Sequence, residues 1–158
     1  MKIALLGTGF GQAHAAVYAD RPDVDEVVVF GRTPDKLATI GGQFGFATTT
    51  DLDALLADPS VDLVDICLPT ALHADVAVRA LQAGHDVLIE LPLATTHADA
   101  HRIIAAQQHP AHRHRWPRGP RLGRRGPPRL PARVRPVHQL VADAPALWGA
   151  RRLAGHLH

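Results

Sequence analysis

The first residues whose types and spacing suggest chemistry form a glycine-rich loop near the N-terminus. The loop follows the apolar residues 2–6 and precedes the alanine-rich residues 12–20. Glycines here allow a tight turn and a close approach of the backbone to a pyrophosphate, and the amides of the following helix attract negative charge. We therefore expect this loop to contact a dinucleotide, through Gly7, Thr8, Gly9, Phe10, Gly11 and Gln12.

The spacing of this loop departs from the usual pattern, in which the third glycine comes three residues after the second. Gln12 stands at that place, and Gly11 comes one residue earlier. A glycine turn without any ligand is the alternative interpretation. The position of the loop, directly after the first strand-like segment and before a helix-like one, favours a dinucleotide site.

Arg32 and Thr33 follow the valine-rich residues 26–30, about 20 residues beyond the loop. A site for NAD usually has an acidic residue here, which accepts hydrogen bonds from the ribose 2′-hydroxyl. Arg32 instead offers a guanidinium suited to a 2′-phosphate, with the Thr33 hydroxyl beside it. The pair favours NADP over NAD, and the alternative is a solvated arginine next to a helix cap.

The segments around these residues alternate between strand and helix patterns. We expect strands over residues 2–6, 26–30, 46–49, 63–68 and 87–89. We expect helices over residues 12–20, 51–58 and 96–107. Another helix would begin at residue 34 with Thr33 as its cap and run until Gly41 and Gly42. A further helix, with Thr70 as its cap, would run from about residue 72 to 83. Such alternation predicts an α/β fold with a doubly wound parallel sheet, a Rossmann domain, over residues 1–107.

Several motifs along residues 7–107 occur together in one known family. The glycine loop leads into His14, residues 62–73 read DLVDICLPTALH, residues 80–87 read ALQAGHDV, and residues 90–94 read ELPLA. In these motifs the chain resembles the glucose–fructose oxidoreductase and inositol dehydrogenase family, called Gfo/Idh/MocA. The resemblance implies oxidation or reduction of sugar- or polyol-type substrates at a hydroxyl or carbonyl carbon, with NADP or NAD as cofactor.

The resemblance also implies roles for individual residues. Leu68, Pro69, Thr70 and His73 would line the cofactor near its nicotinamide ribose, and Glu90 and Pro92 would lie near the nicotinamide. Each has a plainer alternative: Thr70 as a helix cap, Pro69 as a strand terminator, His73 as a first-turn residue facing water. Cys67 is expected to be a small core residue.

Two departures from the family predict impaired catalysis. The family has a lysine between the glutamate and the proline, and this chain has Leu91, which has no proton to transfer. The family's substrate domain is also not recognisable in the sequence after residue 108. We therefore assign no catalytic residue, and expect a sugar or polyol substrate only if a substrate domain is supplied.

Residues 108–158 differ sharply in composition from the rest. Up to Gln108 there are six lysines and arginines against fourteen acidic residues, whereas the rest has eleven arginines and one acidic residue. We expect this basic, proline-rich tail to be disordered, and its composition suggests GC-rich coding sequence read out of frame after a frameshift or truncation. The alternative is a non-catalytic nucleotide-binding module whose basic tail contacts nucleic acid or another acidic partner. Of these two partners, we do not expect nucleic acid.

Composition limits the remaining possibilities. No apolar stretch approaches a membrane span, and the N-terminal apolar run is too short for a signal peptide. The single cysteine excludes an internal disulfide and a cluster of cysteine ligands, which fits the cytoplasm. His109, His112 and His114 have no cysteine or acidic residue near them in the sequence, so we expect no metal site.

Overall fold

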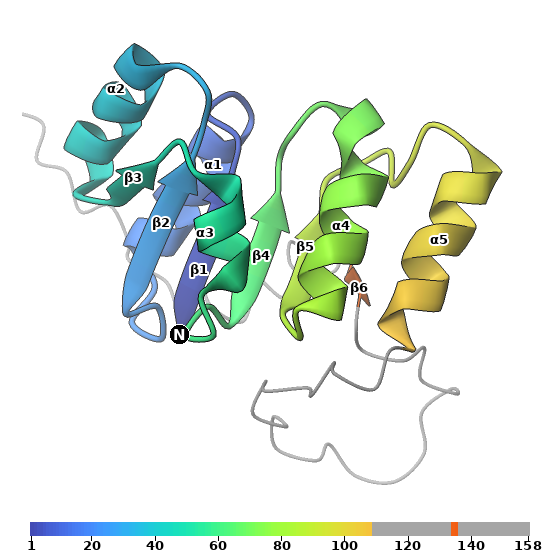
Figure 1. The fold of residues 1–158 in the computed structure, drawn as a ribbon. Coiled ribbons are helices and arrows are strands. Elements are labelled where there is room, and N and C mark those ends of the chain that lie inside the picture. Colours follow the sequence, from blue (N-terminus) through green and yellow to red (C-terminus); the bar gives the residue numbers. More distant parts are fainter. Residues whose placement is uncertain (109–133, 136–158) are drawn as a thin grey trace, which may run out of the picture.

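A computed structural model describes residues 1–108 and 134–135 of the chain. The described part is an α/β sandwich around one parallel sheet, whose strands lie in the order β3-β2-β1-β4-β5-β6 (Figure 1). The strands are β1 (Lys2–Leu6), β2 (Glu26–Phe30), β3 (Ala47–Thr49), β4 (Leu63–Ile66), β5 (Asp86–Ile89) and β6 (Val134–Arg135). The predicted doubly wound parallel sheet is confirmed.

The chain reverses its direction across the sheet between β1 and β4, which are neighbours. The helices are α1 (Gly11–Ala19), α2 (Pro34–Phe44), α3 (Leu52–Ala57), α4 (His73–Gln82) and α5 (His97–Gln107), with a 3-10 turn, η1 (Thr70–Leu72), before α4. In such sheets the carboxyl ends of the two strands at the reversal form the usual ligand crevice. Both candidate regions described below lie at this edge.

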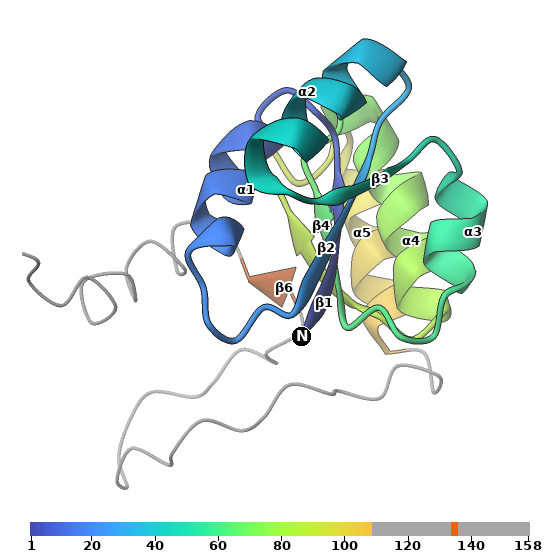
Figure 2. The same ribbon diagram turned by 90° about the vertical axis from the view of Figure 1, so that its left-hand side faces the viewer.

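Helices cover both faces of the sheet, as Figure 2 shows from the side. Successive side chains of a strand point to opposite faces, and β1 follows this rule. Ile3 and Leu5 pack with residues of α1 and α2, whereas Ala4 and Leu6 pack with residues of α3, α4 and α5. This double burial explains why β1 and β2 are largely apolar in the sequence, and why β4 is apolar except for Asp65.

One expected helix end and one expected helix cap were wrong. Helix α2 does not stop at Gly41 but continues to Phe44, and Gly45 ends it with a φ of 71°. A Cβ atom on Gly41 would lie 2.9 Å from Thr48 Cγ2, so glycine is needed there for helix–strand packing. Thr70 caps no helix but begins η1, and Leu72 holds the N-cap position of α4. Thr33 holds the predicted N-cap position of α2, although its side chain forms no capping hydrogen bond.

The tail is outside the description except for β6, which pairs with β5 in parallel. The expected disorder, the frameshift interpretation and the three tail histidines therefore fall on residues outside the described range. None of the helices that the structure describes has the length and hydropathy of a membrane span.

Candidate functional site

The glycine loop joins the carboxyl ends of three neighbouring strands. Gly7 donates its amide to the carbonyl oxygen of Phe30 at 2.9 Å, and its φ is 115°. A Cβ atom on Gly7 would lie only 2.5 Å from the carbonyl oxygen of Cys67. The tight turn predicted for Gly7 is therefore also a close contact between β1 and the end of β4.

The other two glycines of the loop have different surroundings. A Cβ atom on Gly9 would meet no atom within 4 Å, because this residue faces open space at the surface. On Gly11 it would make ordinary contacts with Leu5 and with Cys67 Cβ, 3.5 and 3.6 Å away. Gly9 thus leaves room for a ligand, and Gly11 lies where α1 packs against the sheet.

Helix α1 starts without a side-chain cap. Phe10 occupies the N-cap position without a side-chain hydrogen bond, and the first turn contains no acidic residue. The exposed Thr33 and Arg32 lie next to this loop, because a Cβ atom on Gly31 would be 2.8 Å from Thr8 Cγ2. Arg32 forms no ion pair with any residue in the described part of the chain.

The candidate cofactor-binding residues that follow β4 differ in their exposure to solvent. Pro69 is exposed, while Leu68 and Thr70 are partly buried at the start of η1. His73 does not face water, because it is only 1% exposed. Its Nε2 lies 2.7 Å from the carbonyl oxygen of Leu68 and its Nδ1 lies 3.1 Å from that of Pro92, so this ring joins the segments that follow β4 and β5.

Residues 90–94, called here the Glu90 motif, follow β5 directly. The Glu90 side chain is partly buried, and its Oε2 accepts a hydrogen bond from the Leu91 amide at 3.2 Å. Leu91, at the position where the resemblance implies a lysine, is 61% exposed. The Leu91–Pro92 peptide bond is cis.

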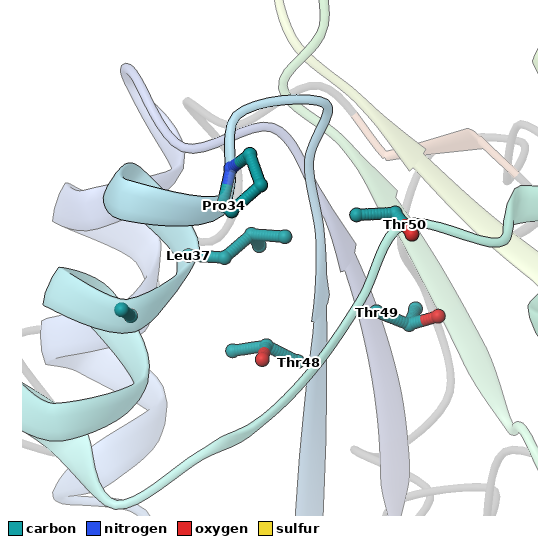
Figure 3. A pocket seen from close by; sticks show the side chains of 6 residues that line it. Pro34, Leu37, Thr48, Thr49 and Thr50 are labelled. Atoms are coloured by element: carbon teal, nitrogen blue, oxygen red, sulfur yellow. The ribbon is translucent and has the colours of Figure 1, made fainter.

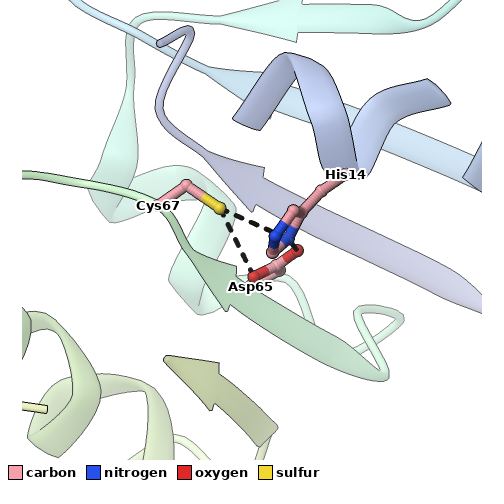
Figure 4. A group of neighbouring side chains, drawn as sticks. All are labelled: His14, Asp65 and Cys67. Carbon is pink, nitrogen blue, oxygen red and sulfur yellow. Dashed lines mark hydrogen bonds and ion pairs between the residues drawn. The ribbon is translucent and has the colours of Figure 1, made fainter. Parts of the chain in front are cut away.

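A buried polar cluster lies beneath the loop, and the sequence analysis did not predict it. Asp65 is fully buried, and its Oδ2 lies 2.6 Å from His14 Nδ1 and accepts a hydrogen bond from the Tyr18 hydroxyl at 2.6 Å. Cys67 Sγ lies 3.4 Å from His14 Nδ1 and 3.6 Å from Asp65 Oδ1 (Figure 4). On the other side of the ring, His14 Nε2 approaches Glu90 Oε1 to 2.9 Å without hydrogen-bond alignment.

The environment of this cluster shifts its proton equilibria. Burial opposes a charged His14, but the carboxylates of Asp65 and Glu90 outweigh it and raise the pKa of His14 above its ordinary value. Burial, reinforced by Asp65, raises the pKa of the Cys67 thiol and of the Tyr18 phenol. The two carboxylates therefore favour the protonated form of His14, while burial favours the neutral thiol of Cys67 and the neutral phenol of Tyr18.

Two periodicities bring these residues together. His14 and Tyr18 are four residues apart and share one face of α1. Asp65 and Cys67 are two residues apart and point to the same face of the sheet, the face that α1 covers. The available signal in the sequence was an aspartate inside an apolar strand, which implies a buried partner.

The structure also has an open hollow of about 420 Å³ between α2 and β3. It is lined by Pro34, Leu37, Ala38, Thr48, Thr49 and Thr50 (Figure 3). None of the glycine-loop or cluster residues belongs to this lining. We therefore place the candidate site at the loop and not at the hollow.

Comparison with known proteins gives one consistent result. Residues 1–112 match the model of the oxidoreductase family with an NAD-binding Rossmann fold, Gfo/Idh/MocA. A 4-carboxy-2-hydroxymuconate-6-semialdehyde dehydrogenase of Sphingobium is 36% identical over 110 residues, which cover 68% of this chain and 35% of that protein.

Solved structures agree with this match. Biliverdin reductase from Synechocystis, in complex with biliverdin and NADP+, superposes with a TM-score of 0.62 and 32% identity over 66% of this chain and 34% of its own. Levoglucosan dehydrogenase, in complex with NADH and levoglucosan, superposes with a TM-score of 0.63 and 31% identity over 67% of this chain and 31% of its own.

The chain thus spans about a third of the length of the relatives it matches. The match lies on the part that contains the glycine loop, Arg32 and the Glu90 motif. The chain belongs to the Gfo/Idh/MocA oxidoreductase family, whose NAD-binding Rossmann domain it contains.

Proposed function

We propose that this chain is the NADP-binding part of an oxidoreductase that acts on sugar- or polyol-type hydroxyl or carbonyl groups. The observation that carries the NADP preference is Arg32, an exposed residue directly after Gly31, which lies against Thr8 of the glycine loop. Arg32 has no ion-pair partner among the described residues. A bidentate donor in this place suits a 2′-phosphate. The family match supports dinucleotide binding in general.

The loop geometry supports the placement of the pyrophosphate. Gly9 leaves open space on the surface, and the N-terminal amides of α1 have no side-chain cap and no acidic neighbour in the first turn. These amides can bind an anion and stabilise its charge through the helix dipole. The pyrophosphate would therefore lie over Gly9, with the 2′-phosphate directed to Arg32 and Thr33.

The nicotinamide would lie toward the ends of β4 and β5, near Pro69, Thr70, Glu90 and Pro92. His73 supports this side by joining the two segments through backbone carbonyls. A sugar-type substrate is supported by the levoglucosan dehydrogenase among the relatives.

Hydride transfer by this chain is expected to be impaired. A lysine at position 91 would offer a charged donor and a transferable proton, and Leu91 offers neither. With NADP+ and a panel of sugars and polyols, we expect no turnover by the purified chain. Turnover at rates typical of enzymes would contradict this part of the proposal and leave cofactor binding unaffected.

Calorimetric titration with NADPH and then NADH tests cofactor binding and preference. We expect NADPH to bind more tightly, and Arg32→Asp to weaken NADPH binding about tenfold or more, about 1.4 kcal/mol, with little effect on NADH. Lys36→Asp is the matched control, because it changes the charge equally on the exposed surface of α2. Equal affinities for both nucleotides would contradict the NADP preference, and no binding of either would contradict cofactor binding.

A further inference from the structure

The buried cluster under the glycine loop has the composition of a transition-metal site. Its donor atoms, on His14, Asp65 and Cys67, all lie within 4.8 Å of one another. They are an imidazole nitrogen, a carboxylate oxygen and a sulfur, a set that zinc and cobalt prefer over magnesium or calcium. We propose that His14, Asp65 and Cys67 are three ligands of a mononuclear site for a zinc-type divalent ion.

The distances agree with this coordination. Zinc binds sulfur at about 2.3 Å and nitrogen or oxygen at about 2.0 Å, so tetrahedral ligand atoms are roughly 3.3–3.6 Å apart. Cys67 Sγ lies 3.4 Å from His14 Nδ1 and 3.6 Å from Asp65 Oδ1. Asp65 Oδ1 faces the sulfur, while Oδ2, only 2.6 Å from His14 Nδ1, also accepts the Tyr18 hydroxyl. Asp65 can therefore ligate through Oδ1 and keep Tyr18 on Oδ2.

The residues around the three ligands suit their orientation. Histidine ligands generally direct their second nitrogen to a carboxylate or a carbonyl, which fixes the ring. Glu90 Oε1 lies 2.9 Å from His14 Nε2, on the side of the ring away from Asp65 and Cys67. Glu90 would thus hold Nδ1 toward the metal, and Tyr18 would hold the carboxylate.

The surroundings of the site also suit a divalent cation. Carboxylate oxygens of Asp65 and Glu90 lie 2.6 and 2.9 Å from the two ring nitrogens of His14, so two acidic side chains are present to offset the charge of the metal. The metal would bind Cys67 as the thiolate, and the thiol proton would be released to solvent. Three protein ligands leave one tetrahedral position without a protein ligand, as in catalytic and not structural zinc sites.

Cobalt is the probe, because a thiolate bound to Co²⁺ gives a near-ultraviolet charge-transfer absorption that histidine and carboxylate ligands do not give. Cys67 is the only cysteine, so such a band in the folded chain reports this site even though the chain has 11 histidines. We expect one equivalent of Co²⁺ to produce the band in the full chain, and Zn²⁺ to abolish it stoichiometrically. No band in the folded chain would overturn the proposal.

Variants separate the three-ligand site from adventitious binding. Cys67→Ser should remove the band, and His14→Gln and Asp65→Asn should each weaken Co²⁺ binding at least tenfold. His101→Gln, an exposed histidine on α5, should change nothing. Circular dichroism shows which variants are folded. If Asp65→Asn does not fold, Cys67→Ser still tests the site, because serine is close to isosteric with cysteine. A band that is equally strong in folded His14→Gln, or in urea, would assign the metal to the cysteine alone and overturn the proposal.

Discussion

The charged side chains at the amino and carboxyl edges of the sheet differ in their exposure and in their partners. At the amino edge, Lys2 Nζ lies 3.2 Å from Glu26 Oε1 and 3.0 Å from Asp58 Oδ2, and the Met1 ammonium pairs with Asp25. Asp25 and Glu26 are exposed, and Asp58 is partly buried. At the carboxyl edge, Asp65 is fully buried with His14, while Arg32 is exposed without an ion-pair partner in the described part.

The histidines at the two edges also differ in the groups that surround them. His85 at the amino edge is buried, and its ring nitrogens lie 3.0 and 2.8 Å from the backbone carbonyl oxygens of Val61 and Leu56. His14 at the carboxyl edge lies between two carboxylates. Surface pairs contribute little to stability, whereas a buried charge is costly without its partner. The amino edge is therefore expected to tolerate changes that the carboxyl edge does not.

The largest expected effect is that of Asp65→Ala. The substitution leaves the His14 ring and the Tyr18 hydroxyl without the carboxylate that they share. Breaking a buried pair in this way costs about 3–5 kcal/mol, which we expect in the free energy of unfolding measured with urea. Tyr18→Phe is the control, because it removes one hydrogen bond worth about 1 kcal/mol. Equal effects of the two substitutions would show that His14 needs no buried partner.

The next effect separates two glycines of one loop. Gly7→Ala places a Cβ atom 2.5 Å from the Cys67 carbonyl oxygen at a φ of 115°, so we expect a loss of about 3 kcal/mol or more in the free energy of unfolding. Gly9→Ala has no neighbour within 4 Å and should change stability by less than about 0.5 kcal/mol. Its expected effect is a tenfold or larger loss of NADPH affinity by calorimetry. Normal NADPH binding by Gly9→Ala would contradict the placement of the pyrophosphate.

The smallest expected effect concerns Asp58 at the amino edge. Hydrogen bonds from Ser60 and the ammonium of Lys2 lower the pKa of this carboxyl below its ordinary value. A carboxyl whose pKa is lowered by folding stabilises the fold at pH values above its unfolded-state pKa. This contribution is lost as the pH falls through the folded-state pKa. The difference in unfolding free energy between wild type and Asp58→Asn should therefore be constant near neutral pH and shrink below about 3.8. A difference that persists in acid would show that charge is not its cause.

Local signals in the sequence predicted most of the fold. The predicted bounds of β1 and β2 are those of the structure, because each is a continuous apolar run with clear ends. The end of α2 was missed because Gly41 serves packing against Thr48, which depends on a contact between separate elements. The ligand contacts of the glycine loop and of Arg32 were inferred from residue type and position alone, and they stay predictions.

The buried cluster could not be predicted in the same way. His14 and Asp65 are 51 residues apart, and only the pairing of β1 with β4 brings α1 over Asp65. His73 was expected either at the cofactor or in water, and its contacts with two backbone carbonyls are long-range features of the folded chain. Sequence patterns identify what a residue offers, whereas its partner depends on the topology.

The close packing of Gly31 has a consequence for cofactor engineering. A Cβ atom at this position would lie 2.8 Å from Thr8 Cγ2 and 3.1 Å from Leu37 Cδ2, whereas the next residue, Arg32, is exposed. Two adjacent positions thus have opposite mutational tolerance: one is fixed by the scaffold, and the other is free to vary. A library that exchanges one nicotinamide cofactor for the other should therefore vary position 32 and keep position 31 as glycine.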